Sequence, residues 1–456
     1  MKNLDPFFKA KSVAVIGVSQ SPEKVGHVIF RNFVDGGFDG KIYAVNPNAE
    51  EVLGRRSYRS VKDIEEPVEL GIVAVPADAV LRVVDECGKK GIRHLVIITA
   101  GFKEAGNVVL DKKLAALLAK HKILCIGPNC LGTFDSRTSL DSLFLPRYRL
   151  QRPGPGSISF VTQSGAVGSA IMDYATEEGY NFAKFVSYGN AMNVDEADIL
   201  EYLGNDSETK VICMYIEATT NGKKFLDVAR RVSRKKPVIA IKGGTTDAGS
   251  KATLSHTGSL AGSADVYFAA FRQAGVIRAR TLAEMFEYAK ILDKCMAPRG
   301  GRVQIITNGG GYGILSTDAV VSCGLQVAEM ERRTVGALRK TMPPLVTIAN
   351  PLDLIGDATA ERYQAAISAC LEDRNIDIVL VILLYQTPLL STDVVNYIIE
   401  ANDMKKKPVV VVSTGGEFTE LLSDNLEKNN IPCFDFPDSA VGAIKQLVDY
   451  HINKKK

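Results

Sequence analysis

Among the five histidines of this chain, His256 has the context that best suits chemistry. It lies in a run from Gly243 to Ser263 made chiefly of glycine, serine and threonine, between a short apolar run and a segment of helical pattern. A loop with so little apolar surface is expected to move or to be held by a ligand. Near neutral pH an unprotonated imidazole nitrogen attacks a phosphoryl group. The sequence therefore predicts a histidine that takes up a phosphoryl group and carries it between sites.

Glu217 is the predicted partner of this histidine, because the second ring nitrogen of a reacting imidazole needs an acceptor that fixes its tautomer. The acid directly follows the apolar run Val211–Ile216, one predicted strand before the loop of His256. Both residues are therefore expected at the carboxyl edge of the same parallel sheet, where ligand sites gather. The alternative is a solvated loop acid, which is the usual position of glutamate.

Two glycine turns complete a predicted phosphate site without a metal ion. Each follows a predicted strand and opens a helix, so that free N–H groups point at an anion. Such turns are common between strands and helices, and each is weak support alone. The residues concerned are Gln163, Ser164 and Gly165 in the first turn and Gly309, Gly310 and Gly311 in the second.

The N-terminal block ends its first predicted strand in a small-residue turn that suits a phosphate. It is not the G-x-G-x-x-G turn of dinucleotide-binding domains, and the next strand ends in Val45-Asn46-Pro47, where such domains offer a carboxylate to the ribose. Coenzyme A carries a phosphate on its ribose, which a carboxylate would repel, so the missing acid favours coenzyme A over NAD. Lys24 either pairs with a phosphate or is a solvated helix residue.

Further turns follow the other strand ends of this block and should line the same crevice. Cys130 lies in one of them, but no histidine nearby in sequence could activate it, so we interpret it as a passive thiol. The predicted coenzyme A contacts are Gly17, Ser19, Lys24, Val25, Asn46, Val75, Pro76, Thr99, Ala100 and Asn129.

Short β-branched runs alternate with longer helical segments along the whole chain, which indicates an α/β fold with parallel sheets. The pattern occurs in three consecutive blocks, the first Rossmann-like and the other two flavodoxin-like. A proline-containing polar stretch separates the first two. The predicted divisions are a coenzyme A-binding domain at 1–133, a linker at 134–156, a domain carrying the histidine loop at 157–297, and a second flavodoxin-like domain at 298–456.

The composition favours small-molecule chemistry in a reducing compartment. The longest apolar stretch is far shorter than the roughly 20 residues of a membrane span, and the start shows no signal-peptide profile, so a cytoplasmic protein is expected. The eight cysteines contain no C-x-x-C pair, which argues against a disulfide framework or a zinc site. A net charge of only +3 gives no electrostatic signal for nucleic acid or a membrane surface.

The motifs Ser255–Gly262, Gly127-Pro128-Asn129-Cys130, Gln163-Ser164-Gly165 and Asn308–Gly311, with Asn350-Pro351-Leu352-Asp353, resemble those of the alpha subunit of ADP-forming acetyl-CoA synthetases, in the superfamily of succinate–CoA ligase. The resemblance covers essentially the whole chain. It implies that acyl-CoA, ADP and phosphate interconvert with acid, CoA and ATP through an acyl phosphate and a phosphohistidine at His256.

The same resemblance implies a partner, because the family places ADP and Mg²⁺ on an ATP-grasp domain and all three blocks here are otherwise assigned. A separate ATP-grasp beta subunit and an alpha2–beta2 heterotetramer are therefore expected. Two alternatives remain at this point, a non-catalytic coenzyme A-binding regulatory protein and an NAD-dependent enzyme. The preferred acyl group is not predictable from these motifs.

Overall fold

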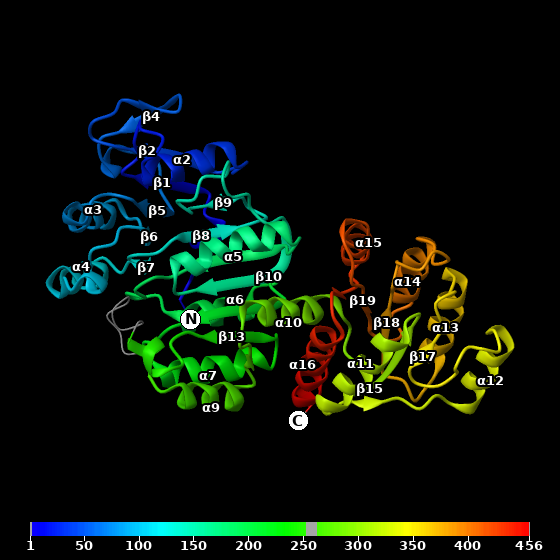
Figure 1. Cartoon of the computed structure of the whole chain (residues 1–456). Coiled ribbons are helices and arrows are strands. Elements are labelled where there is room, and N and C mark those ends of the chain that lie inside the picture. The colour runs from blue at the N-terminus through cyan, green and yellow to red at the C-terminus, as the bar shows by residue number, and fades with distance from the viewer. Residues whose placement is uncertain (1, 252–261, 456) are drawn as a thin grey trace. The chain divides into compact units, whose positions relative to one another are not determined.

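A computed structural model describes residues 2–251 and 262–455 and divides the chain into two compact units, Met1–Arg278 and Ala279–Lys456. The first unit contains two sheets and the second unit contains one (Figure 1). His256 falls on residues outside the described ranges. The two units are described separately below.

The first sheet has the strand order β3-β4-β2-β1-β5-β6-β7, and its strands are parallel except for the β3–β4 pair. All five residues of β1 are buried, as expected for a central strand covered on both faces. The order reverses at β1, between β2 and β5, which is where open α/β sheets bind ligands. The strands are β1 (Ser12–Ile16), β2 (Lys41–Val45), β3 (Glu51–Val52), β4 (Arg55–Tyr58), β5 (Leu70–Val73), β6 (His94–Ile97) and β7 (Leu124–Ile126). The helices are α1 (Pro6–Lys9), α2 (Val25–Asp35), α3 (Ala77–Lys90) and α4 (Val108–Lys120).

The second sheet has the order β14-β13-β12-β10-β11-β8-β9. Its core strands are parallel, and β8 and β9 extend it in antiparallel fashion beside β11. The strands are β8 (Gly132–Asp135), β9 (Leu140–Asp141), β10 (Pro155–Thr162), β11 (Phe182–Ser187), β12 (Val211–Ile216), β13 (Val238–Lys242) and β14 (Ile277–Arg278). The helices are α5 (Gly165–Glu177), α6 (Glu196–Asn205), α7 (Gly222–Ser233) and α9 (Ala264–Ala274).

The segment predicted as a linker at 134–156 contributes β9 and parts of β8 and β10 to this sheet, so that prediction missed ordered structure. The prolines that suggested a linker lie outside the short β8–β9 pairing. Asp141, fully buried in β9, accepts hydrogen bonds from the Nε atoms of Arg147 (3.1 Å) and Arg152 (2.9 Å). These ion pairs tie the proline-containing stretch to the sheet.

One buried apolar cluster joins the two sheets of the first unit. It includes Phe7 and Phe8 of α1, Val13 of β1, Val161 of β10 and Ile212 of β12. A core that is continuous across both sheets holds their loops in a fixed relation, because packed interiors deform little. The loops of both sheets can therefore build one site.

The second unit contains a parallel sheet of order β16-β15-β18-β19-β20, with β17 paired to β15. Helix α10 packs within this unit, where Lys290 Nζ lies 2.6 Å from Glu427 Oε1. The strands are β15 (Arg302–Thr307), β16 (Gln326–Val327), β17 (Leu352–Asp353), β18 (Ile378–Ile382), β19 (Val409–Val412) and β20 (Cys433–Phe434). The helices are α10 (Leu282–Lys294), α11 (Gly310–Ser322), α12 (Arg332–Thr341), α13 (Ala360–Glu372), α14 (Asp393–Asp403), α15 (Glu417–Lys428) and α16 (Pro437–Lys455).

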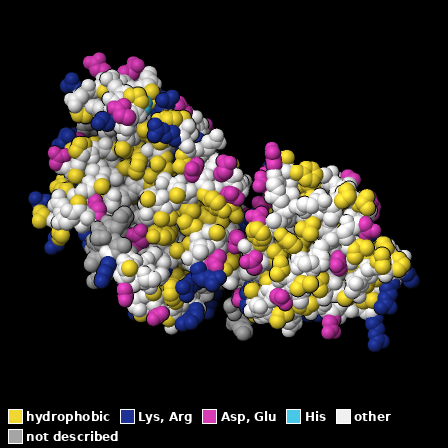
Figure 2. All heavy atoms as spheres, in the orientation of Figure 1, with side chains coloured by type: hydrophobic (Ala, Val, Ile, Leu, Met, Phe, Trp, Pro, Cys, Tyr) yellow, Lys and Arg dark blue, Asp and Glu magenta, His cyan; other side chains and the backbone are white. Residues whose placement is uncertain are grey.

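The predicted α/β class with mostly parallel sheets is confirmed. On the face drawn in Figure 2, acidic and basic side chains are interspersed with apolar ones. Within residues 2–251 and 262–455, no helix combines the length and the apolar character needed to cross a membrane.

Candidate active site

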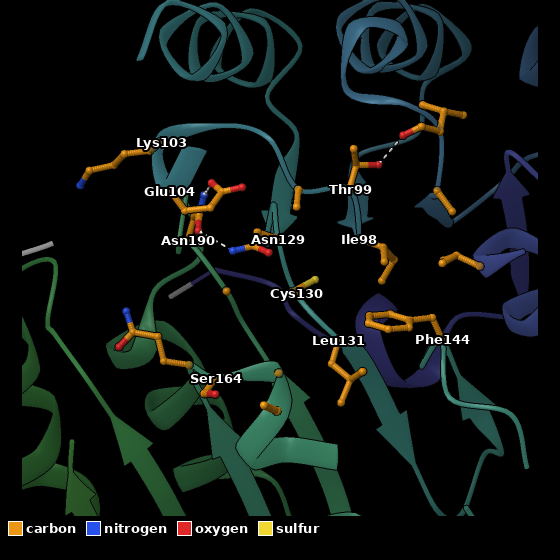
Figure 3. Close-up of a pocket in the computed structure, with 18 residues that line it drawn as sticks. Ile98, Thr99, Lys103, Glu104, Asn129, Cys130, Leu131, Phe144, Ser164 and Asn190 are labelled. Atoms are coloured by element: carbon orange, nitrogen blue, oxygen red, sulfur yellow. Dashed lines mark hydrogen bonds between the residues drawn. The ribbon is translucent and has the colours of Figure 1, made fainter. Parts of the chain in front are cut away.

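A cavity of about 590 Å³ lies in the first unit where the strand ends of its two sheets meet (Figure 3). The loops after β5, β6 and β7 of the first sheet contribute to it, as do the β10–α5 turn and the loop after β11 of the second sheet. Carboxyl ends of parallel strands thus face one space from both sides, which is the usual location of ligand sites in such sheets. The lining includes Val25, Val75, Ile98, Thr99, Ala100, Glu104, Asn129, Cys130, Leu131, Phe144, Gln163, Ser164, Gly165, Ala166 and Asn190.

Half of the predicted coenzyme A contacts line this cavity. They come from α2 and from three separate strand ends, so the tertiary fold brings them together. Those in the lining are Val25, Val75, Thr99, Ala100 and Asn129, and those that do not line it are Gly17, Ser19, Lys24, Asn46 and Pro76.

Gly17 and Asn46 shape the turn after β1. Gly17 has a φ of +97°, and a Cβ there would lie 2.4 Å from the carbonyl oxygen of Ala74, so only glycine fits. Asn46 donates from Nδ2 to the carbonyl oxygen of Val18, and its Oδ1 accepts from the N–H of Asn48. Lys24 is exposed at the N-cap of α2, without a hydrogen bond from its side chain to the helix.

Glu104 is a cavity residue that sequence reasoning missed. Its Oε1 accepts from the N–H of Gly101 at 2.6 Å, and its Oε2 accepts from Asn190 Nδ2 at 2.6 Å. Burial opposes ionisation, but the hydrogen bonds of Asn190 and of the turn lower the pKa of Glu104. In Figure 3, Glu104, Asn190 and Asn129 stand together on one side, and Ile98, Leu131 and Phe144 lie on the apolar side. The cavity therefore has one charged wall and one apolar wall.

The start of α5 presents free N–H groups to the cavity. Ser164 Oγ caps the helix by accepting from the N–H of Val167 at 3.3 Å, and the N–H of Ser164 donates to Thr162 Oγ1 at 3.1 Å. The N–H groups of Gly165 and Ala166, at the first two helical positions, have no acceptor within the helix. Of the predicted phosphate contacts, Gly165 thus offers its amide, whereas the amide of Ser164 is already used.

Glu217 lies directly after β12 and is only 7 % exposed, which excludes the solvated alternative. Its N–H and that of Ala218 donate to Gln163 Oε1 at 2.9 and 3.0 Å. The side-chain oxygen of Gln163 holds the turn that carries Glu217, and the phosphate role of Gln163 stays a prediction. Because Gln163 also lines the cavity, it connects this turn with the start of α5.

Two further residues beside Glu217 were missed by the sequence reading. Tyr215 hydrogen-bonds to Glu217, and burial together with that carboxylate raises the pKa of Tyr215. Lys242 pairs with Ile216 across β12 and β13, and its ammonium lies 4.7 Å from the ring centre of Tyr267. Burial lowers the pKa of Lys242, and the charge of Glu217 opposes that shift. The signal for Lys242 was available, since it ends an apolar strand just as Glu217 follows one.

Cys130 lies in the cavity wall but is a poor nucleophile. Burial raises the pKa of its thiol to about 12, and Sγ donates to the carbonyl oxygen of Ile97 at 3.3 Å. A thiol in this state is mostly protonated near neutral pH and unreactive. Among the described residues, no group of three His, Cys, Asp or Glu side chains is placed to hold a metal ion.

The second predicted phosphate turn lies in the second unit, between β15 and α11. A Cβ on Gly309 would lie 2.3 Å from Leu384 Cδ1, and one on Gly310 would lie 3.0 Å from Asp353 Oδ2. An apolar side chain and a carboxylate therefore stand at the start of α11. This geometry does not favour an anion there, and the phosphate role of Gly309, Gly310 and Gly311 stays a prediction.

Comparison with protein families finds three consecutive matches. Residues 11–135 match a CoA binding domain, residues 155–292 a succinyl-CoA ligase like flavodoxin domain, and residues 303–448 a ligase-CoA domain. This order of domains defines the class of CoA ligases.

Comparison with individual relatives identifies the family within this class. The chain is 39 % identical over 453 residues to the alpha subunit of acetate–CoA ligase (ADP-forming) II of Pyrococcus furiosus, covering 98 % of this chain and 97 % of that one. It is 41 % identical to acetate–CoA ligase (ADP-forming) of Methanocaldococcus jannaschii, covering 98 % of this chain but only 63 % of that protein. The chain belongs to the family of ADP-forming acetate–CoA ligases, and the resemblance inferred from the motifs is confirmed.

A solved structure agrees with this assignment. Acetyl-coenzyme A synthetase 1 of Ca. Korarchaeum cryptofilum, in complex with phosphate and ADP, superposes with a TM-score of 0.94 at 35 % identity. The match covers all of this chain and 98 % of that one. The fold is therefore shared along the whole length.

Proposed function

We propose that this chain is the catalytic alpha subunit of an ADP-forming acyl-CoA synthetase that acts on acetyl-CoA. The reaction interconverts acyl-CoA, ADP and phosphate with the free acid, coenzyme A and ATP. The names of its full-length relatives support this activity. A purely regulatory role, in which the chain only binds coenzyme A, does not explain why Glu217 is buried and why its turn is fixed by hydrogen bonds to Gln163.

The chemistry can be assigned to residues in three steps. Coenzyme A binds along the strand ends of the first sheet, with Val75, Thr99, Ala100 and Asn129 among its contacts. A phosphate oxygen, with phosphate held by the amides at the start of α5, attacks the thioester carbonyl, and the thiolate of coenzyme A leaves. A ring nitrogen of His256 then attacks phosphorus, the carboxylate leaves, and the phosphoryl group is finally transferred to ADP. Glu217 accepts from the other ring nitrogen and stabilises the charged ring.

The observation that carries the proposal is that the side chain of Gln163 contacts two parts of the site at once. Its side chain lines the cavity and also receives the N–H groups of Glu217 and Ala218. The start of α5, which suits phosphate, and the buried acid, which suits a histidine, are therefore joined by one residue. Such a junction is what a reaction passing a phosphoryl group from the cavity to a histidine needs.

We further propose that nucleotide and Mg²⁺ bind to a separate ATP-grasp beta subunit, in an alpha2–beta2 heterotetramer in the cytoplasm. Relatives named as alpha subunits support a partner, and the longer Methanocaldococcus jannaschii relative is consistent with fusion of the two parts. Within this chain we propose the functional divisions 1–133, 157–297 and 298–456, the first binding coenzyme A and the second carrying His256.

The test uses the chain together with its beta subunit and ATP labelled in the terminal phosphate. The expected product is a phosphorylated chain whose label is lost in acid and kept in base, and which disappears in a His256→Asn variant. Adding coenzyme A and acetate should discharge the label. A wild-type complex that binds coenzyme A but never acquires label would overturn the catalytic assignment and leave the regulatory alternative.

A further inference from the structure

The four residues from Glu217 to Thr220 form a turn whose backbone N–H groups all donate to side chains. Glu217 and Ala218 donate to Gln163 Oε1, as described above. The N–H of Thr219 donates to Tyr267 Oη at 2.9 Å, and the N–H of Thr220 donates to Glu196 Oε1 at 3.1 Å. We name this turn the acid turn.

The three acceptors come from separate elements around the acid turn. Gln163 lies between β10 and α5, Glu196 opens α6, and Tyr267 belongs to α9. Tyr267 also hydrogen-bonds to the hydroxyl of Thr219 at 3.1 Å, and Tyr188 donates to Gln163 Oε1 at 3.4 Å. The turn is therefore held from several directions rather than by its own backbone.

Glu196 is an unusual residue to use for packing alone. Its side chain is fully buried, and Oε2 has no hydrogen-bond partner among the described residues. Burial, with a smaller contribution from Asp195, raises its pKa to about 7. An unsatisfied buried carboxyl group costs stability, and an apolar residue of similar size would avoid that cost. Its contribution to a neighbouring element is the hydrogen bond from the N–H of Thr220.

The position of a carboxylate follows the backbone that carries it, and reactions depend steeply on that position. Misplacing a catalytic group by about 1 Å can reduce a rate on the order of 100-fold. Glu217 lies at the first position of the acid turn, so a tilt of the turn moves its carboxylate. Fixing all four amides removes that freedom.

We propose that Gln163, Tyr267 and Glu196 are positioning residues that hold the acid turn and thereby fix the position of the Glu217 carboxylate. The inference rests on the proposed phosphohistidine chemistry. These side chains act through Glu217 and need no contact of their own with the transferred phosphoryl group.

Two positions allow a sharp test, because Gln163 also lines the cavity and would confound it. Tyr267→Phe keeps the ring and removes the acceptor of the Thr219 amide. Glu196→Leu removes the acceptor of the Thr220 amide, whereas Glu196→Gln retains an oxygen that can accept the same bond. Tyr202→Phe is the matched control, since Tyr202 is a buried tyrosine that donates to Asp5 at 3.1 Å away from the acid turn.

The measurement is the rate at which labelled ATP phosphorylates the intact complex, with the KM for acyl-CoA and the thermal unfolding temperature recorded alongside. Tyr267→Phe and Glu196→Leu should each slow phosphorylation about five- to tenfold, since each removes the acceptor of one backbone amide of the acid turn. The KM for acyl-CoA should stay unchanged, and Glu196→Gln should restore most of the rate.

A double-mutant cycle with Glu217→Gln separates positioning from a general structural effect. If Tyr267 and Glu196 act through the carboxylate, adding either variant to Glu217→Gln should slow phosphorylation by less than twofold beyond Glu217→Gln alone. The positioning role is overturned if the rate reductions of the two single variants multiply in full in the double variant. It is also overturned if Tyr202→Phe slows phosphorylation as much as Tyr267→Phe does. A wild-type complex that acquires no label instead overturns the proposed function, so the two failures are distinct.

Discussion

Two strand–turn–helix openings in this chain follow the same local plan, β10–α5 in the first unit and β15–α11 in the second. In each a threonine hydroxyl, Thr162 or Thr307, donates to the carbonyl oxygen two residues on and accepts that residue's N–H. In each a glycine six residues after the threonine, Gly168 or Gly313, allows the helix to approach the strand. The same backbone hydrogen bonds and the same glycine position are thus found in both openings.

The two openings differ in what stands at the helix start. Ser164 caps α5, and the cavity lies beside it, whereas a side chain at the corresponding Gly309 would meet the end of the Leu384 side chain. The second opening also has Asp353 against Gly310. The lesson is that extra glycines can mark close packing rather than a phosphate site.

The residue after each threonine reinforces the contrast. Gln163 receives the amides of a turn that carries Glu217, while Asn308 receives the N–H of Leu384 at 3.0 Å and donates to its carbonyl oxygen at 3.1 Å. Both amides thus hold the turn after a neighbouring strand. Of these two turns only the first carries an acid, so the proposed histidine chemistry is assigned to the first opening.

Removing that acid should produce the largest effect. Glu217→Gln keeps the size of the side chain but loses the negative charge that stabilises a protonated ring, so phosphorylation of the chain should slow on the order of 100-fold. The assay is label transfer from ATP in the complex with the beta subunit. Glu201→Gln, which alters a less buried acid on α6, serves as control. If the Glu217→Gln complex were phosphorylated as fast as the Glu201→Gln control, the acid would not distinguish the first opening from the second.

Glu196, an acceptor of the acid turn, should also make stability depend on pH. Asn308, the acceptor of the turn after β18, has no charge to titrate. Glu196 has a pKa of about 7 when folded, against 4.5 when unfolded, so the native chain retains a proton between these values. Stability therefore falls as pH rises through this window, on the order of 2 kcal/mol. Glu196→Gln should lose this pH dependence. The free energy of unfolding of the variant, relative to that of wild type, should therefore be higher at pH 8 than at pH 5. Parallel unfolding curves at both pH values would contradict it.

A charge placed at the start of α5 should weaken phosphate binding. Ala166→Asp puts a carboxylate beside the free amides, copying what Asp353 does at α11, and should raise the KM for phosphate about tenfold through competition and repulsion. Ala166→Asn is the neutral control of matched size. Equal KM values for the two variants would mean that phosphate binds elsewhere.

The longer parallel strands and their order along the chain were predictable because apolar runs of four to eight residues alternate with helical segments. The short strands β3, β4, β14, β16, β17 and β20, of two to four residues each, were not predicted. The strands at 132–141 were missed because β9 has only two residues and lies among prolines and charged side chains. Their stability comes from pairing with β11 and from the Asp141 ion pairs, which are contacts distant in sequence.

Within the site, Glu217 was predictable because a charged residue directly after an apolar strand is rarely there for packing. Gln163 was named as a phosphate contact, but its contact with the turn after β12 was not predictable, since only the fold shows that its side chain reaches that turn. Glu196 and Tyr267 were missed for the same reason. Each looks ordinary in its own helix, and its proposed role depends on contact with a turn that is distant in the sequence.

The smallest expected effect tests the second opening directly. Asp353 Oδ1 accepts from the N–H of Ile355 at 2.9 Å, and its other oxygen faces the start of α11, where it already supplies the negative charge that a helix N-terminus favours. Asp353→Asn keeps the shape and removes the charge, so an anion site hidden there would be relieved of repulsion. We expect less than a twofold change in the KM for phosphate and in the phosphorylation rate, because Leu384 still occupies the space beside Gly309. A severalfold fall in the KM for phosphate would show that both openings bind the anion, and that their difference lies only in the acid turn.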